Sequence, residues 1–286
     1  MPRAGSIAAF CAVWKRAPTT LFLAGFTCRN TPSSASSCKK CCARKCWPRK
    51  NAWPIISRQV EGMIPAKPAA WADRIFYPYV MHLFHRHFQR ICLLGEVPRC
   101  EAQLPLLLLP NHSTWWDGFF VYLLNKKNFY RQPYLMMLEE QLRRYPFFAK
   151  LGVFSINPHS ASSVRASLRY AAALMQQTRP VLLGFFPQGE LRPWDTRPLG
   201  YQRGLEVLLK MFGDKVNLLN VAIKTEFRNE RLPEAFFLFD QNRVVGHDDL
   251  LRSQDLEKIE EGLLSELTQR IKRGEQGRVL VGRASS

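Results

Sequence analysis

Apolar positions recur at helical spacing where the patterned part of the chain begins. This spacing is followed by Trp71, Ile75, Phe76, Tyr79, Val80, Leu83, Phe84, Phe88 and Ile91, with Pro78 among them. It predicts an amphipathic helix, and Arg74, Arg86 and Arg90 lie between the apolar positions. Two interpretations stay open. Either the helix lies in the headgroup layer of a membrane, which suits aromatic rings mixed with cations, or it packs on its own domain.

Further along, short apolar runs alternate with helical patterns. Leu104–Pro110 and Val181–Phe186 are runs typical of strands buried on both faces of a sheet. A helix is expected to begin near Ser113 or Thr114, and another after Ser160, which is a good N-cap residue. The alternation predicts an α/β fold, with a largely parallel sheet flanked by helices and an N-terminal amphipathic helical segment. The remaining predicted elements are a helix near 201–212, strands near 216–223 and 235–240, and a closing helix carrying Leu256, Ile259, Leu263, Leu267 and Ile271.

The first 60 residues differ from the rest in charge. They contain eleven Lys and Arg and no Asp or Glu, so they hold most of the net charge of +18. Residues 17–28 resemble a short signal core, and the acid-free basic composition resembles a transit peptide. We expect residues 1–62 to be a disordered tail, a targeting segment or a mis-assigned start. Residues 63–286 then form the folded domain, with amphipathic membrane-surface helices over 63–95 and an α/β core over 96–286.

Three other classes of function find little support. Cys38, Cys41, Cys42 and Cys46 lack the loop that separates the two ligand pairs of a zinc site, so no metal is expected. The basic tail attracts anions in general, but nothing aromatic and periodic interleaves its charges, so no nucleic acid partner is expected. A metal or nucleic-acid module in residues 1–62 is the alternative for that segment. No run reaches the ~18 to 20 apolar residues that cross a bilayer, so a soluble or surface-bound protein is expected.

One segment carries residues suited to proton transfer. His112 and Asp117 follow the buried run Leu104–Pro110, at the type of strand end where ligands of α/β sheets bind. Histidine takes up protons near neutral pH, and a carboxylate bound to its other ring nitrogen fixes the tautomer. Five residues apart, the two side chains can meet across the first helical turn. Alone, this pair is weak support for a catalytic site.

The segment gains meaning from a resemblance. Over roughly residues 70–240 the chain resembles the glycerol-phosphate and lysophospholipid acyltransferase family. The N-H-x4-D motif of that family is matched by Asn111, His112 and Asp117, and its F-P-E-G-T-R motif corresponds to Phe-Pro-Gln-Gly-Glu-Leu-Arg at 186–192. The resemblance implies transfer of a fatty acyl group to an acceptor hydroxyl in lipid or glycolipid biosynthesis. His112 is then the general base and Asp117 its orienting partner.

The resemblance also implies the partners. The donor is acyl-CoA or acyl carrier protein, used as a co-substrate, and no cofactor is expected because the sequence has neither a phosphate-binding loop motif nor a dinucleotide fingerprint. A serine or cysteine nucleophile elbow is also missing from the sequence, which favours direct attack by the acceptor. The expected location is peripheral, on a membrane lipid surface at its cytoplasmic face. Organellar targeting by residues 1–62 stays open.

This chain departs from the family where basic residues are expected. Leu191 stands where the second motif has its arginine, and in an ungapped alignment Glu139 replaces a lysine and Asn157 an arginine. A site built for a phosphate dianion needs such donors. We therefore expect an acceptor without a phosphate beside its reacting hydroxyl, such as a polyol or sugar. Arg192, one place late, argues the other way.

The acceptor site is expected to include Asn111, Gln188, Gly189, Glu190 and Arg192. Gln188 donates as well as accepts hydrogen bonds. Gly189 either brings backbone N–H close to the substrate or forms a plain turn.

Two further alternatives remain. Trp115 and Trp116 either line the acyl entry or pack over the first motif. The altered second motif also leaves room for a catalytically inactive lipid-binding protein on the same fold, which the retention of His112 and Asp117 opposes.

Overall fold

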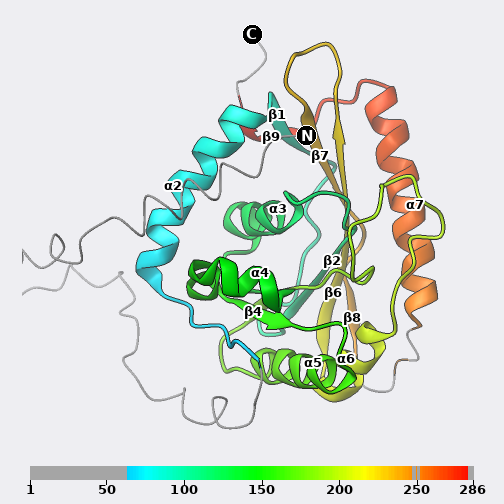
Figure 1. Cartoon of the computed structure of the whole chain (residues 1–286). Helices are drawn as coiled ribbons and strands as arrows, with labels where there is room; N and C mark the ends of the chain where they lie inside the picture. The colour runs from blue at the N-terminus through cyan, green and yellow to red at the C-terminus, as the bar shows by residue number, and fades with distance from the viewer. Residues whose placement is uncertain (1–62, 247–248, 250–251, 283–286) are drawn as a thin grey trace, which may run out of the picture. The chain divides into compact units, whose positions relative to one another are not determined.

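A computed structural model describes residues 63–246, 249 and 252–282. The predicted tail at 1–62, with its basic excess and its cysteine cluster, lies outside these residues. Within them, one mixed sheet carries helices on both faces (Figure 1). Its strands are β1 (Arg90–Leu94), β2 (Leu106–Pro110), β3 (Gln132–Leu138), β4 (Val153–Ile156), β5 (Val181–Gly184), β6 (Val216–Glu226), β7 (Glu234–Phe239), β8 (Arg243–Val245) and β9 (Arg278–Gly282). The helices are α2 (Ala70–His87), α3 (Asp117–Leu124), α4 (Glu139–Arg144), α5 (Ala161–Met175), α6 (Gly204–Phe212) and α7 (Ser253–Lys272), with a π-helix at Asn125–Phe129 and a 3-10 helix at Pro146–Leu151.

The sheet is largely parallel. Five neighbouring strands run in one direction in the order β4-β3-β5-β2-β6. Strands β7 and β8 pair antiparallel with β6, β1 is parallel to β7, and β9 is antiparallel to β1. The predicted fold class is therefore confirmed. Because the five strands are parallel, their carboxyl ends meet at one edge, where ligands of such sheets bind.

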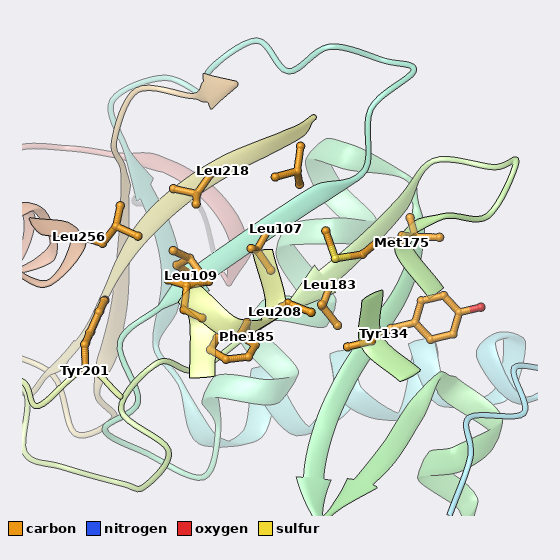
Figure 2. Close-up of a cluster of buried hydrophobic side chains, with 14 of the residues drawn as sticks. Leu107, Leu109, Tyr134, Met175, Leu183, Phe185, Tyr201, Leu208, Leu218 and Leu256 are labelled. Atoms are coloured by element: carbon orange, nitrogen blue, oxygen red, sulfur yellow. The ribbon is translucent and has the colours of Figure 1, made fainter. Parts of the chain in front are cut away.

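The face covered by α5, α6 and α7 holds the main hydrophobic core. Successive leucines of β2 point to opposite faces, so Leu107 and Leu109 enter this core with Leu183 of β5. Figure 2 shows part of it, including Leu107, Leu183 and Leu208 of α6. Burial of each such leucine stabilises the fold by about 1.5 to 3 kcal/mol. Burial on both faces explains the unbroken apolar run that predicts β2.

Helix α3 packs on the other face, with α2 against its outer side (Figure 1). Phe120 of α3 meets Phe237 of β7 with ring centroids 5.2 Å apart. Gly184 of β5 lies where α3 comes close, since a Cβ added there would be 3.0 Å from Cγ1 of Val121. This close packing fixes α3 against the sheet, and the first residue of α3 is Asp117.

The predicted amphipathic helix exists but is shorter than expected. Helix α2 ends at His87, and Phe88 already has extended backbone. Ile91 lies in β1, buried between β7 and β9, so the helical assignment of Phe88 and Ile91 is wrong. The reason is that the apolar run Ile91–Leu94 forms a buried strand, and Ile91 fits the helical spacing only by coincidence. The α/β core therefore begins at Arg90 rather than at residue 96.

The apolar face of α2 is turned towards the protein. Phe76 packs against Phe119 of α3, with ring centroids 5.8 Å apart. Asp73 accepts a hydrogen bond from the Tyr122 hydroxyl at 2.7 Å and pairs with Lys126 at 2.5 Å. Packing on its own domain is thus confirmed for this face. Among the residues that the structure describes, no helix combines the length and apolar composition needed to cross a bilayer.

Most other elements lie close to their predicted positions. Ser160 caps α5 by accepting a hydrogen bond from the Ser163 N–H, as expected. The helix after β2 begins at Asp117 rather than at Ser113 or Thr114, because these two residues form a turn around the Asp117 carboxylate. Strands β3, β4, β8 and β9 and helix α4 were not among the predicted elements.

Candidate active site

The two motifs lie side by side at the carboxyl edge of the parallel strands. His112 follows β2, and Phe186 follows β5, the strand next to β2. The Phe185 N–H donates to the Leu108 carbonyl at 2.9 Å and continues the pairing of the two strands. Beyond it, the His112 backbone N–H donates to Oε1 of Gln188 at 2.5 Å. The sheet topology thus joins segments far apart in the sequence.

Asp117 is surrounded by hydrogen-bond donors. Its Oδ2 atom accepts from the His112 ring nitrogen Nδ1 at 2.9 Å and from the backbone N–H groups of Ser113 at 2.7 Å and Thr114 at 2.8 Å. Its Oδ1 atom accepts from the Thr114 hydroxyl at 2.6 Å. The carboxylate is almost wholly buried, with 1% of its side chain exposed. This arrangement holds an ionised carboxylate in one orientation, and the expected meeting of His112 with Asp117 is confirmed.

The His112 ring is held on a second side by an aromatic ring. Phe186 stacks on it with centroids 4.2 Å apart and an angle of 27° between planes. About a quarter of the His112 side chain, 24%, remains exposed. Within the described residues, Nε2 makes no hydrogen bond. Since Nδ1–H donates to Asp117, Nε2 is the ring atom with a free lone pair.

Asn111 ties the first motif to β6. Its side chain accepts from the Ile223 N–H at 2.7 Å and donates to the Ile223 carbonyl at 3.0 Å. Its amide also donates to the Ser113 hydroxyl at 3.1 Å. Asn111 is completely buried. In this structure its side chain is committed to the backbone, so it extends the β2–β6 pairing past the end of β2, instead of facing the acceptor as expected.

Gln188 and Gly189 form the turn of the second motif. Gln188 is buried, and its Nε2 atom has no hydrogen-bond partner among the described residues, while Oε1 accepts from His112. Gly189 has a φ of +72°, a backbone conformation that favours glycine, and its N–H donates to the Phe186 carbonyl at 3.1 Å. The turn reading of Gly189 is thus confirmed. Gln188 therefore contacts the segment of His112 directly.

Glu190 and Arg192 form an ion pair beside the site. Glu190 Oε1 lies 2.6 Å from Nη2 of Arg192 and also accepts from its Nε at 2.8 Å. The Arg192 backbone N–H donates to the His112 carbonyl at 2.9 Å, which brings this loop onto the first motif. The guanidinium group lies against Gly200, where an added Cβ would be 2.1 Å from Nη1. Leu191, between the pair, is exposed.

The other departures from the family pattern lie at the same sheet edge. Glu139 follows β3 and pairs with Arg143 at 2.5 Å. Asn157 follows β4, and its side chain accepts a hydrogen bond from the His159 N–H at 3.1 Å. Both strands are parallel to β5 and β2. Glu139 and Asn157 therefore lie at the same edge of the sheet as His112, and each binds a residue close to it in the sequence.

The two tryptophans behave differently. Trp116 is buried against Phe84 and Phe88, with ring centroids 5.8 and 5.0 Å away. Trp115 is 40% exposed and packs on Trp116 and Phe119. Trp116 thus packs over the motif, and Trp115 is the one of the two that meets solvent.

The sequence analysis did not predict several residues that the structure places at the site. The Thr114-Trp-Trp-Asp117 spacing is that of a capping box and could have revealed the backbone N–H groups that hold Asp117. The stacking of Phe186 has no local signal, because only the pairing of β2 with β5 creates it.

Among the described residues, no group of three or more His, Cys, Asp and Glu side chains lies close enough together to hold a metal ion. The three histidines of α2, His82, His85 and His87, form no such group either.

A known protein family is similar to the segment that carries both motifs. The family model described as Acyltransferase matches residues 94–216, which contain both motifs. A solved structure with detectable similarity is the 1-acyl-sn-glycerophosphate (LPA) acyltransferase PlsC from Thermotoga maritima, with a TM-score of 0.41 and 14% identity, over 72% of this chain and 84% of that chain. No curated protein gives a significant match. Over residues 94–216, the chain is therefore similar to the acyltransferase family.

Proposed function

We propose that the chain transfers a fatty acyl group from acyl-CoA or acyl carrier protein to a hydroxyl of a lipid or glycolipid precursor. The observation that carries this proposal is the hydrogen bond of 2.9 Å between His112 Nδ1 and Asp117 Oδ2, within the segment that matches the family. It leaves Nε2 as the basic atom of the ring. A base held in one tautomer beside an open edge of the sheet suits proton removal from an acceptor alcohol.

The proposed reaction uses His112 to accept one proton and to return it. Nε2 of His112 takes the proton of the acceptor hydroxyl while the hydroxyl oxygen attacks the thioester carbonyl carbon. The buried Asp117 carboxylate stabilises the imidazolium that forms. When the tetrahedral intermediate collapses, the carbon–sulfur bond breaks and the imidazolium returns the proton to the leaving thiolate. The products are an ester and a free thiol, and His112 is regenerated without an acyl-enzyme.

The charges beside the base favour an acceptor without a phosphate at its reacting end. Arg192 is the one cation of the second-motif segment, 186–192, and Glu190 pairs with it. At the next strand along the edge, Glu139 neutralises Arg143. A phosphate dianion would have to compete with these carboxylates for the guanidinium groups. A polyol or sugar hydroxyl requires no such competition.

A membrane lipid surface is the proposed setting, at its cytoplasmic face. Trp71, Trp115 and Leu191 are large apolar side chains with 40 to 54% exposure. Trp115 is three residues from the base, and Leu191 lies beside Arg192. Tryptophan at such a position suits the headgroup layer, where one side of the ring is apolar and the other wet. Substitution of Trp115 and Leu191 by Ser should weaken cosedimentation with anionic lipid vesicles, and unchanged cosedimentation would contradict this setting.

The acceptor class is tested by thiol release from palmitoyl-CoA and from palmitoylated acyl carrier protein. The full chain is assayed with glycerol 3-phosphate, lysophosphatidate, a neutral monoacylglycerol and an alkyl glucoside. We expect release with the neutral acceptors. Glycerol 3-phosphate or lysophosphatidate as the best acceptor would contradict the neutral site, and no release with any pair would contradict acyl transfer. The variant Leu191→Arg, made at an exposed position, should shift the preference towards lysophosphatidate by about tenfold.

A further inference from the structure

Helix α7 lies outside the segment that matches the family, yet one of its faces is directed at both motifs. Glu257, Glu260 and Glu261 share this face, because residues three and four apart are neighbours on a helix. Within the described residues, none of the three forms an ion pair with a Lys or Arg. Their carboxyl groups instead meet backbone N–H groups and an amide side chain. Glutamates on a helix surface usually serve only to keep that surface solvated, and these contacts show that the three side chains also bind other parts of the protein.

Two of these carboxyl groups hold the loop of the second motif. Glu257 accepts hydrogen bonds from the backbone N–H groups of Gly200 and Tyr201, the latter at 3.3 Å. Glu261 accepts from the Leu199 N–H at 3.1 Å. Bonds from N–H to a carboxylate are among the stronger ones in proteins. The far end of the loop, 199–201, is therefore anchored to α7.

From this anchor, two short routes lead to His112. Gly200 has a φ of +79° and lies against the Arg192 guanidinium group, and the Arg192 N–H donates to the His112 carbonyl. The Gln202 N–H donates to the Pro187 carbonyl at 2.8 Å, next to Gln188, which accepts from the His112 N–H. Movement of the 199–201 segment would thus displace contacts on both sides of the base.

Glu260 lies near the first motif, on the face of the sheet that α7 covers. It is completely buried and accepts a hydrogen bond at 3.1 Å from the side chain of Asn220, which pairs in register with Leu109 of β2. The Asn111 backbone also acts to lower the pKa of this carboxyl group, against the larger effect of burial, which raises it. Asn111 is the residue before His112. Through Asn220 of β6, Glu260 therefore supports the end of β2 that leads to His112.

We propose that Glu257 and Glu260 are positioning residues. From α7, they hold in place the two segments that carry His112 and Gln188. They touch neither substrate nor the reacting atoms. Their effect on transfer rests on the proposed function, whereas their effect on the motif segments does not. Helix α7 thereby becomes part of the site, although no motif marks it.

The test compares the full-length wild type with Glu257→Ala and Glu260→Ala, and with Glu257→Gln and Glu260→Gln, which keep a hydrogen-bond acceptor. Glu266→Ala is the matched control, because Glu266 lies on the same helix, is half exposed and pairs with Arg270. Hydrogen–deuterium exchange is read in peptides covering 111–117 and 186–203. In parallel, kcat and KM are measured with palmitoyl-CoA and a neutral acceptor.

We expect each Ala variant to speed exchange locally, for Glu257 in 186–203 and for Glu260 in 111–117, by about tenfold. It should lower kcat by about fivefold or more with less than a twofold change in KM. The Gln variants should recover most of both, and Glu266→Ala should match the wild type. Ala variants that match Glu266→Ala would overturn the proposal, as would a uniform rise of exchange in all peptides. A wild type without transfer activity would contradict the proposed function alone, since the exchange data still decide the positioning role.

Discussion

Oδ2 of Asp117 lies 2.9 Å from Nδ1 of His112, and the same oxygen accepts two backbone N–H groups. The backbone N–H groups of Ser113 and Thr114 therefore hold the carboxylate in place, and the carboxylate in turn holds the imidazole. A side chain held by four hydrogen bonds has little freedom to rotate away from the ring. The turn that contains both motif residues is thus also the device that orients them.

Replacement of Asp117 by Asn should lower kcat by about 10³- to 10⁴-fold, the scale known for this substitution in the Ser-His-Asp triad. The amide keeps a carbonyl acceptor but loses the charge that stabilises the imidazolium. The measurement is kcat for thiol release, with circular dichroism to confirm folding. Asp195→Asn, at an exposed position, is the control with the same change of charge. A decrease of less than tenfold for Asp117→Asn would refute the orienting role.

Gln188 should matter for stability as well as for activity. Its buried Oε1 atom accepts a hydrogen bond from the partly buried His112 N–H, and replacement by Met keeps the volume but removes this acceptor. A buried N–H left without a partner costs about 1 to 3 kcal/mol of the free energy of unfolding. Urea unfolding of Gln188→Met should show this loss, whereas Gln202→Met, on the exposed part of the loop, should stay within about 0.5 kcal/mol. Equal stability of the two variants would argue against the bond.

The pKa of the Glu260 carboxyl group is raised to about 8. Burial is the main cause, and the charge of Asp240 acts in the same direction. The hydrogen bond from Asn220, the charge of Arg197 and the Asn111 backbone act against it. Between pH 4.5 and 8 the native protein therefore holds a proton that the unfolded chain has released. The contribution of Glu260 to the free energy of unfolding is therefore complete below pH 4.5 and is lost as the pH rises through 8.

The variant Glu260→Gln removes this titration. Relative to the variant, the wild type should lose about 1.4 kcal/mol of unfolding free energy for each pH unit between roughly 5 and 8. Unfolding in urea at pH 5, 6.5 and 8 measures the difference. Glu266→Gln is the control and should follow the wild type, because Glu266 is exposed. Parallel curves for the wild type and Glu260→Gln would show that Glu260 titrates normally.

The sequence was sufficient to predict the contact between His112 and Asp117 and the parallel strands β2 and β5 that precede the two motifs. The leucine run of β2 is buried on both faces, and the motif after it has a fixed spacing, so both are local signals. Strand β1 was missed because Ile91 continues the helical spacing of α2. Strand β3 was missed because it begins with Gln132 and Pro133 and is only partly buried, which gives no clear period.

The environment of the base could not be read from the chain in the same way. The contact of Phe186 with His112 depends on the order of strands in the sheet. Glu257 and Glu260 lie far along the chain from both motifs. Glu257 contacts the 199–201 segment and Glu260 contacts Asn220 of β6 only because α7 packs against this face of the sheet. On a helix at the surface, glutamates are usually solvated side chains, so no sequence pattern distinguishes these from Glu266.

The central claim is that His112 removes the acceptor proton. It is tested most directly by thiol release from palmitoyl-CoA with the full-length wild type, His112→Ala, His112→Gln and the control His82→Ala, whose histidine is exposed on α2. Both His112 variants should lose at least 10² to 10⁴ of kcat while circular dichroism shows the wild-type fold, and His82→Ala should be unchanged. Turnover of a folded His112 variant within a few fold of the wild type would contradict the account.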